Sequence, residues 1–262
     1  MREVIGEQVK ELAEEHPCYG YRKIWALTQK TGLQGSRSTV YRVLKEAGLL
    51  LEPRYQQELR ENSRARKQYL HRPTEPNQLW QVDLTQVPIS DYGVYWVTSV
   101  VDYYSRYVLT CHFSPTHTAQ DVIEALEKAL EEARQFYVIE ESEVITLVSD
   151  NGPQFTSRRF REYLQSAPFR HVRARSHHPE TLGMVERFHQ SLKYEEIWPN
   201  DYEDPLEAQM RIAIYREHYN QRRPHQALDY GVPAERYCEQ ALREVETPET
   251  RYTFIPESVS LS

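Results

Sequence analysis

The 262-residue sequence has little cysteine, no long apolar run and no excess of positive charge. Its three cysteines, Cys18, Cys111 and Cys238, are odd in number and widely spaced, which argues against a disulfide framework and a paired zinc site and indicates a reducing compartment. The longest apolar runs have the length of a strand, so no membrane span is expected. The first ten residues, MREVIGEQVK, lack the apolar core of a signal peptide. These absences predict a cytoplasmic protein.

The formal net charge of −7, taken alone, argues against a nucleic-acid partner. The local distribution of charge matters more than the total, and two segments are strongly basic. Residues 54–72 contain six Lys or Arg against two acids, and residues 158–175 contain six Arg against one acid. The acidic residues gather elsewhere, at 124–143 and 235–257. Each basic segment is either a solvated surface or a surface that binds phosphate groups.

The first 50 residues have the apolar spacing of three short helices. The second helix ends near Gly32, and a turn at 32–35 leads to a third helix over 36–47. This order matches a helix-turn-helix, which places its second helix in the major groove of DNA. A helical hairpin that only packs on the next domain has the same spacing. The outward residues of the third helix, which the first interpretation places on DNA, are Arg37, Thr39, Arg42 and Lys45.

Residues 51–77 are polar, basic and poor in large aliphatic side chains. Helix-forming residues dominate 55–70, and Pro73 and Pro76 then interrupt the pattern. We predict a basic linker that is partly helical. Three of its residues are expected to contact DNA: Arg64, Arg66 and Lys67.

Residues 78–200 have the pattern of one α/β domain. Three strands in a row predict an antiparallel meander, and helices alternate with strands after it, so a mixed sheet with helices on both faces is expected. Residues 201–262 add a further helix and an acidic tail punctuated by proline. In chain order, the sequence predicts strands at 79–84, 94–101 and 106–113, a helix at 118–133, a strand at 144–148, a helix at 155–164, a strand at 169–174 and helices at 184–197 and 204–222.

Three acidic residues that are far apart in the sequence are expected to meet at the rim of this sheet. Asp83 is predicted at the end of the first strand, Asp150 at the end of the fourth, and Glu186 in the first turns of the helix that follows Gly183. Side chains at the carboxyl ends of strands gather where α/β sheets form their sites. Carboxylate oxygens are the ligands that Mg²⁺ and Mn²⁺ prefer. The ordinary alternatives are a turn at 150–152 and a solvated helix glutamate.

Between Asp150 and Glu186 stand the 35 residues 151–185. This spacing resembles the DDE catalytic triad of retroviral integrases and of related bacterial insertion-sequence transposases. The resemblance spans about 70–237, and Leu182 departs from it, because the family more often has a polar residue there. That departure puts the loop that touches DNA in doubt, but not the metal ligands. The matching motifs are YGYRKI at 19–24 in the helix-turn-helix, LWQVDLT at 79–85, VDYYSR at 101–106, SDNGPQF at 149–155, HPETLGMVERFH at 178–189, Lys193, Tyr219-Asn220, Arg223-Pro224-His225, Leu228 and Pro233.

The resemblance implies a ribonuclease H-like fold, with a mixed five-stranded sheet and flanking helices behind a small all-helical helix-turn-helix domain. It implies a transposase that cuts DNA at the ends of an insertion sequence and joins the resulting 3′-OH to target DNA. Two Mg²⁺ or Mn²⁺ ions are expected in the site, with Asp83 shared between them and Asp150 and Glu186 each holding one. The further residues expected to contact DNA are Asn151, His177, Arg187 and Lys193.

The implied partners are the terminal inverted repeats of the transposon, the target DNA and further copies of the chain. An upstream helix-turn-helix partner protein is also expected in part of this family, and the implied location is the nucleoid of a bacterial cell. The competing hypotheses are a DNA-binding protein without catalysis, a ribonuclease H or junction resolvase of the same fold, and a structural protein. A tyrosine recombinase would need an Arg/His frame that the sequence does not have. The three acids oppose the non-catalytic hypotheses, and the motif around Glu186 opposes the nucleases.

Overall fold

The computed structural model of the chain describes residues 2–32, 35–51, 73–139, 143–174 and 182–245. Three helices at the N-terminus pack around a small apolar core that includes Val9, Ile24 and Val40. Ser36 caps the third of them by accepting a hydrogen bond from the Thr39 backbone N–H at 3.2 Å. The predicted three-helix pattern is confirmed. These helices are α1 (Arg2–Glu15), α2 (Tyr21–Lys30) and α3 (Arg37–Glu46).

The second unit is a five-stranded mixed sheet in the order β3-β2-β1-β4-β5. β1 pairs with β2 and β2 with β3 in antiparallel fashion, whereas β4 runs parallel to both β1 and β5. The expected mixed sheet with an antiparallel meander is therefore confirmed. The strands are β1 (Leu79–Ile89), β2 (Gly93–Asp102), β3 (Val108–Ser114), β4 (Ile145–Ser149) and β5 (Phe169–Arg173).

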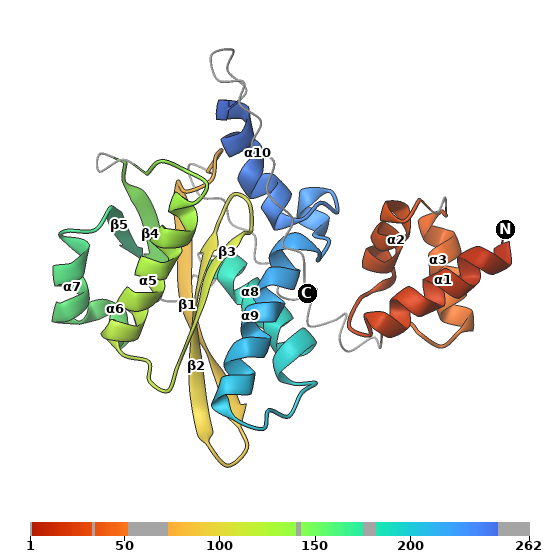
Figure 1. The fold of residues 1–262 in the computed structure, drawn as a ribbon, viewed down its shortest axis with the longest axis horizontal. Coiled ribbons are helices and arrows are strands. Elements are labelled where there is room, and N and C mark those ends of the chain that lie inside the picture. Colours follow the sequence, from red (N-terminus) through yellow and green to blue (C-terminus); the bar gives the residue numbers. More distant parts are fainter. Residues whose placement is uncertain (1, 33–34, 52–72, 140–142, 175–181, 246–262) are drawn as a thin grey trace, which may run out of the picture.

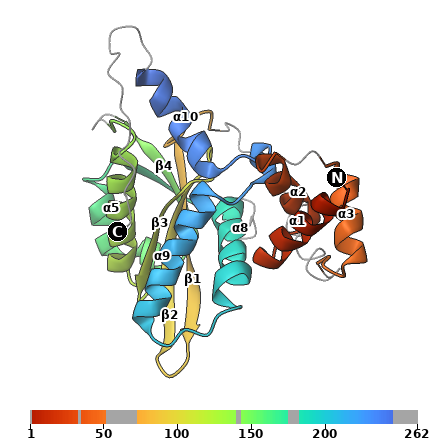
Figure 2. The same ribbon diagram turned by 45° about the vertical axis from the view of Figure 1, so that its right-hand side comes forward.

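Helices cover the sheet on its two faces, because successive strand side chains point to opposite sides. Trp80 and Val82 of β1 join the core beneath α5, whereas Leu79 and Val87 join the core beneath α8 and α9. Figures 1 and 2 show α5 on one side of the sheet and α8 and α9 on the other. The helices of this unit are α5 (Ala119–Arg134), α6 (Pro153–Thr156), α7 (Arg158–Leu164), α8 (Gly183–Leu192), α9 (Pro205–Gln221) and α10 (Pro233–Val245).

The first strand is longer than predicted, which moves Asp83 from the end of a strand to the middle of one. β1 runs to Ile89 and pairs with β2 from Trp80 to Ile89. Its pairing with β4 ends at Gln81. Pro88 is therefore tolerated in the second half of β1, because a strand with one unpaired edge does not need every backbone N–H.

Two predicted helices are interrupted. The helix expected at 155–164 is divided at Ser157, whose extended backbone ends α6 and whose side chain caps α7. The helix expected at 184–197 changes from α to π geometry in the turn Lys193–Ile197. Such π turns are uncommon and are often found at functional sites.

The chain beyond 222 was expected to continue as an acidic tail, but it returns to the sheet as α10. Tyr237 of α10 is fully buried in the core on the α5 face, where its ring stacks on that of Tyr107. None of the helices in the described ranges combines the length and the apolar composition that crossing a membrane requires. All three cysteines are free thiols.

Candidate active site

The pairing of β1 with β4 brings Asp83 and Asp150 together. The last residue pair of that parallel ladder is Gln81 with Val148, and each aspartate follows two residues further along its strand direction. Because side chains alternate with a period of two, both aspartates continue on the face that carries Gln81 and Val148. Val148 packs in the core under α8 and α9. Asp83 and Asp150 therefore belong to the sheet face that α8 covers.

Helix α8 delivers the third acid to the same place. Its first turn contains Glu186, and its apolar side, with Val185 and Phe188, is buried against the sheet. The backbone N–H groups of Met184 and Val185 donate to Oε1 of Gln81 at 2.9 and 3.1 Å. The start of α8 is thus attached to the strand that carries Asp83.

The three carboxylates share one electrostatic environment. Burial raises the pKa of Asp150, and repulsion from Asp83 adds to it, although a hydrogen bond from the Gly152 N–H at 3.0 Å opposes the rise. Burial also raises the pKa of Glu186, again with repulsion from Asp83. Asp83 is therefore the common neighbour of the other two. Within the described ranges, no group of three or more His, Cys, Asp or Glu side chains is close enough to hold a metal ion as it stands.

A histidine that was not predicted lies beside Asp83. His189 stands one turn beyond Glu186 on α8, and its Nδ1 is 3.5 Å from Oδ2 of Asp83. The ring is buried, and its Nε2 has no hydrogen-bond partner among the residues that the structure describes. The signal for it was present in the sequence, because a spacing of three residues on a helix places two side chains on one face.

The predicted DNA contacts of the core are spread around the acids. Asn151 is exposed, and its amide donates to the carbonyl of Ala174 at 2.7 Å, which ties the end of β4 to the end of β5. Arg187 and Lys193 are partly buried on α8 and at the start of the π turn. His177 lies outside the described residues, as do Arg64, Arg66 and Lys67 of the linker.

The four predicted contacts on α3 have different surroundings. Arg42 and Lys45 are exposed. Thr39 shares a hydrogen bond at 2.9 Å with the capping hydroxyl of Ser36. Arg37 lies over the ring of Trp25 at 4.3 Å and near the ring of Tyr230 at 5.4 Å, so its guanidinium is already engaged by two aromatic rings.

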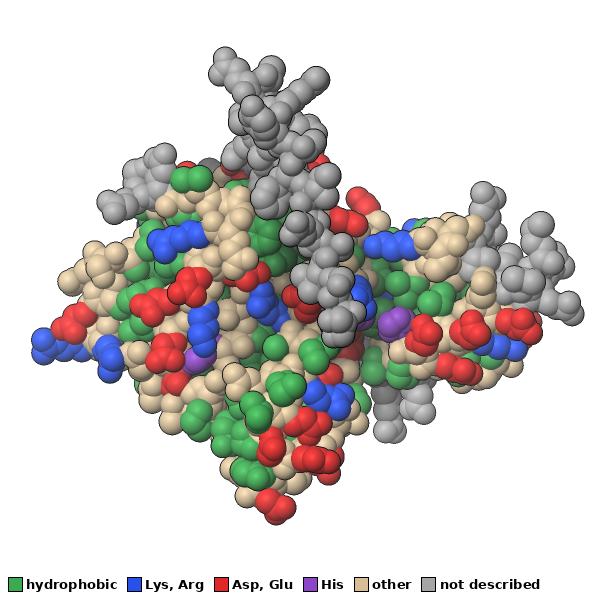
Figure 3. Space-filling view, viewed as in Figure 1, with side chains coloured by type: hydrophobic (Ala, Val, Ile, Leu, Met, Phe, Trp, Pro, Cys, Tyr) green, Lys and Arg blue, Asp and Glu red, His purple; other side chains and the backbone are tan. Residues whose placement is uncertain are grey.

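The described arginines of the basic run at 158–175 are exposed on α7 and on β5, which is an edge strand. Figure 3 shows basic side chains at the edge of the molecule formed by α7. One of them, Arg158, pairs with Glu162 at 2.6 Å in a solvated i,i+4 bridge. Charged side chains on an edge strand also oppose pairing with another chain. Both interpretations of this run therefore stay open.

A buried ionic cluster joins the N-terminal helices to the core, and sequence reasoning missed it. Glu195 of the π turn accepts from Arg223 at 2.6 and 2.8 Å, from Lys23 of α2 at 3.3 Å and from the hydroxyl of Tyr215 at 3.0 Å. Burial and the neighbouring Arg223 lower the pKa of Lys23 to about 7. Tyr19 adds a hydrogen bond to His218 of α9 at 2.9 Å. Figure 2 shows α1–α3 beside the helical segment that continues from α8.

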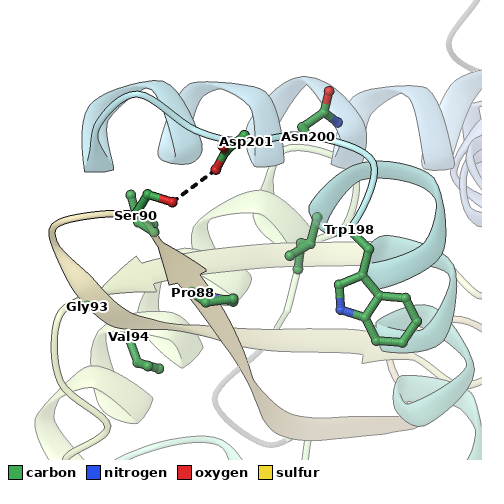
Figure 4. Close-up of a pocket in the computed structure, with 9 residues that line it drawn as sticks. Pro88, Ser90, Gly93, Val94, Trp198, Asn200 and Asp201 are labelled. Carbon is green, nitrogen blue, oxygen red and sulfur yellow. Dashed lines mark hydrogen bonds between the residues drawn. The ribbon is translucent and has the colours of Figure 1, made fainter.

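A pocket of about 410 Å³ opens at the tip of the β1–β2 hairpin, away from the acids. Figure 4 shows Pro88 and Val94 on the hairpin, Trp198 on the neighbouring segment, and a hydrogen bond from Ser90 to Asp201 at 3.1 Å. Pro88 stands five residues beyond the strand position of Asp83, which is about 17 Å along an extended chain. The acidic site is therefore separate from this pocket, whose lining includes none of the three acids.

Comparison with known protein families gives matches along most of the chain. Residues 73–179 and 168–233 match two families that are each described as an integrase core domain, and residues 2–57 match an HTH-like domain. An uncharacterized 31.7 kDa protein of insertion element IS407 from Burkholderia multivorans is 27% identical over 235 residues, which cover 89% of this chain and 80% of the relative. The transposase of insertion sequence IS904 from Lactococcus lactis subsp. lactis is 25% identical over 241 residues, covering 88% of this chain and 92% of the relative.

Among solved structures, a chain of the simian T-cell lymphotropic virus intasome, in complex with the PP2A regulatory subunit B56 gamma, is similar to this chain with a TM-score of 0.52. The match covers 96% of this chain and 79% of that chain at 18% identity. This likeness concerns the fold alone, and it agrees with the mixed sheet described above.

Proposed function

The chain belongs to the integrase-core transposases of insertion sequences, and from that premise we propose that Asp83, Asp150 and Glu186 are its catalytic, metal-holding residues. The chain is accordingly a DNA transposase of the polynucleotidyl transferase class. It cuts DNA at the ends of its insertion sequence and transfers the freed 3′-OH to target DNA. The observation that supports the proposal is that Asp83, on the sheet face that α8 covers, raises the pKa of both Asp150 and Glu186.

The donor set fits a divalent cation. All three side chains offer hard carboxylate oxygens, which Mg²⁺ and Mn²⁺ prefer over softer ligands. Asp83 raises the pKa of both Asp150 and Glu186, a repulsion that a bound cation would relieve. In this proposal Asp83 would be shared by two ions, and Asp150 and Glu186 would each hold one. When bound, such ions lower the pKa of a water or hydroxyl nucleophile and stabilise charge on the phosphate.

The chemistry needs no covalent protein–DNA intermediate. In the first step, an oxygen of water attacks the phosphorus at the transposon end, and the bond to the 3′ oxygen breaks to leave a 3′-OH. In the second step, that 3′-OH attacks a phosphodiester of the target, and a target 3′ oxygen leaves. The protein's part is to hold the three acids and to align both DNA segments, because positioning and electrostatics dominate phosphoryl transfer.

DNA is held, in this proposal, by the helix-turn-helix and by residues around the acids. Arg42 and Lys45 are exposed on α3, which suits contact with phosphates or bases in a major groove. Asn151 and Arg187 directly follow Asp150 and Glu186 in the sequence, and Lys193 begins the π turn that continues from α8. Joining two transposon ends requires at least two copies of the chain, so we propose an oligomer at the bacterial nucleoid. An upstream helix-turn-helix partner stays a prediction.

The test is Mg²⁺-dependent and Mn²⁺-dependent cleavage of a duplex that carries the element's terminal repeat. We expect Asp150→Asn to reduce cleavage by about 10³-fold or more while the protein stays folded. Asp201→Asn, which makes the same change of charge near the hairpin pocket, should keep cleavage within about twofold. Cleavage retained by Asp150→Asn would reject the assignment. Preferential degradation of an RNA–DNA hybrid by the unaltered protein would instead favour a nuclease of the same fold.

A further inference from the structure

We propose that Gln81 is a positioning residue that sets the place of Glu186 relative to Asp83. The inference rests on the proposed function, because it concerns the same acids. Gln81 is fully buried on β1, two residues before Asp83 and on the same face of the strand. Its Oε1 accepts the backbone N–H groups of Met184 and Val185, which immediately precede Glu186.

These two hydrogen bonds replace the cap that α8 lacks. The first four N–H groups of a helix have no partner within the helix, and a side chain at the N-cap position usually satisfies one of them. The N-cap residue of α8 is Leu182, which has no polar side chain to offer. Gln81, more than one hundred residues earlier in the chain, supplies the acceptor from the sheet. The start of α8 is thus fixed by the strand that carries Asp83.

The consequence is a short mechanical link between two catalytic acids. Asp83 is the second residue after Gln81 on β1, and Glu186 directly follows Met184 and Val185, whose N–H groups Gln81 binds. A shift of the helix start would move Glu186 directly. Displacements of about 1 Å in a catalytic site can cost about 10²-fold in rate. The hydrogen bonds of Gln81 therefore act on catalysis without touching DNA or metal.

The amide side chain of Gln81 suits its position beside Asp83. A neutral amide accepts two N–H groups and adds no charge near Asp83, which already raises the pKa of Asp150 and of Glu186. A glutamate would keep the acceptor oxygens at the cost of a fourth negative charge. A methionine has a similar shape and no comparable acceptor. These two replacements separate the hydrogen bonds from the charge.

A matched control lies on the same face of the sheet. Asn220 of α9 is also a fully buried amide, and it bonds both the N–H and the carbonyl of Val108 at the start of β3, at 2.9 and 3.0 Å. Asn220→Leu removes an amide that joins a helix to a strand, as Gln81→Met does. Its partner strand is β3, which β2 separates from the strand that carries Asp83. A general loss of packing affects both variants.

The experiment uses the full chain and three readouts: amide hydrogen exchange at residues 183–186, Mn²⁺ affinity by calorimetry without DNA, and the Mn²⁺ concentration for half-maximal end cleavage. Gln81→Met should accelerate exchange at Met184 and Val185, weaken Mn²⁺ binding by about 10-fold or more and raise the half-maximal concentration in parallel. Asn220→Leu should lower the melting temperature and leave both Mn²⁺ values within about twofold of the unaltered protein.

Unchanged Mn²⁺ affinity in folded Gln81→Met, or an equal change in Asn220→Leu, would overturn the inference. If Gln81→Met does not fold, Gln81→Glu decides, because it should retain slow exchange at both amides; fast exchange there would contradict the capping role. Failure of the proposed function has a different signature. The unaltered protein would then neither bind Mn²⁺ at the acids nor cleave DNA, while the exchange of the two amides still responds to Gln81.

Discussion

Glu186 and Glu195 stand nine residues apart on one helical segment, but their surroundings act on them in opposite directions. Burial raises the pKa of Glu186, and repulsion from Asp83 adds to the rise. Burial alone would also raise the pKa of Glu195, but Arg223 and Lys23 outweigh it and lower that pKa to about 2. The fold places Glu195 beside two cations and leaves Glu186 beside a second carboxylate.

The comparison distinguishes charged groups that stabilise the fold from charged groups that are proposed to bind metal. Glu195 has two cationic partners, Arg223 and Lys23, so this cluster stabilises the contact between the helix-turn-helix and the core. The acids near Glu186 instead repel one another, because Asp83, which lies beside His189, raises the pKa of both Asp150 and Glu186. Carboxylates whose pKa is raised by a neighbouring carboxylate mark candidate sites. Function is expected where the fold places like charges side by side.

The largest expected effect is on stability, at Glu195. Glu195→Gln should lower the free energy of unfolding by about 3 kcal/mol, because it leaves the buried guanidinium of Arg223 without its counter-charge. Glu207→Gln, in a partly exposed pair with Arg211, should cost less than about 1 kcal/mol. Urea denaturation of both variants measures the two values. Equal losses would show that the cluster joining the two units is no different from a surface pair.

The second effect is on pH dependence, which is expected to differ between the site of Glu186 and the cluster of Glu195. Because the pKa values of Asp150 and Glu186 are raised, protons compete with Mn²⁺ at a higher pH than for ordinary carboxyl groups. The pKa of Glu195 is depressed, so its contribution to stability is complete above pH 4.5 and is lost only as the pH falls toward 2. On acidification, calorimetry should show Mn²⁺ affinity declining first, and thermal unfolding should show the melting temperature declining later. Simultaneous loss would contradict the comparison.

The smallest expected effect is a gain in the stability of the protein when Asp150 loses its charge. A carboxyl group whose pKa is higher in the folded protein than in the unfolded chain opposes folding once the pH has risen through its ordinary value of 3.8. Asp150→Asn should therefore stabilise the metal-free protein at neutral pH, by up to about 1 kcal/mol, although it abolishes cleavage. Thermal unfolding in EDTA tests this. A clear loss of stability would mean that Asp150 is a structural carboxylate.

The sequence predicted the order of the elements well, because period-two and helical patterns are local. It missed the second half of β1, since Pro88 is unfavourable in a paired strand and is allowed here only by the free edge. It missed the break at Ser157, which depends on how that side chain caps α7. It also missed the π turn, which depends on the direction in which Glu195 meets its partners. The return of Tyr237 to the core was also hidden, because one aromatic residue among acidic neighbours gives no periodic signal.

For the candidate site, spacing and motifs predicted the three acids, and the register of β1 with β4 supports the proximity of Asp83 and Asp150. The sequence did not identify Gln81 or His189 as neighbours of the acids, because both relations depend on how α8 crosses β1. Nor did it identify Lys23 and Glu195 as partners, since 172 residues separate them in the chain. Contacts between distant segments follow from packing, and no local pattern encodes them.

The central claim is that Asp83, Asp150 and Glu186 jointly hold divalent ions. Crystals of the protein soaked in Mn²⁺ test it most directly, through anomalous scattering recorded for the unaltered chain and for Glu186→Gln. We predict anomalous peaks within coordination distance of these carboxylates in the unaltered chain and a weakened or missing peak in the variant. Mn²⁺ peaks only at other sites, under conditions in which the protein cleaves transposon ends, would contradict the claim.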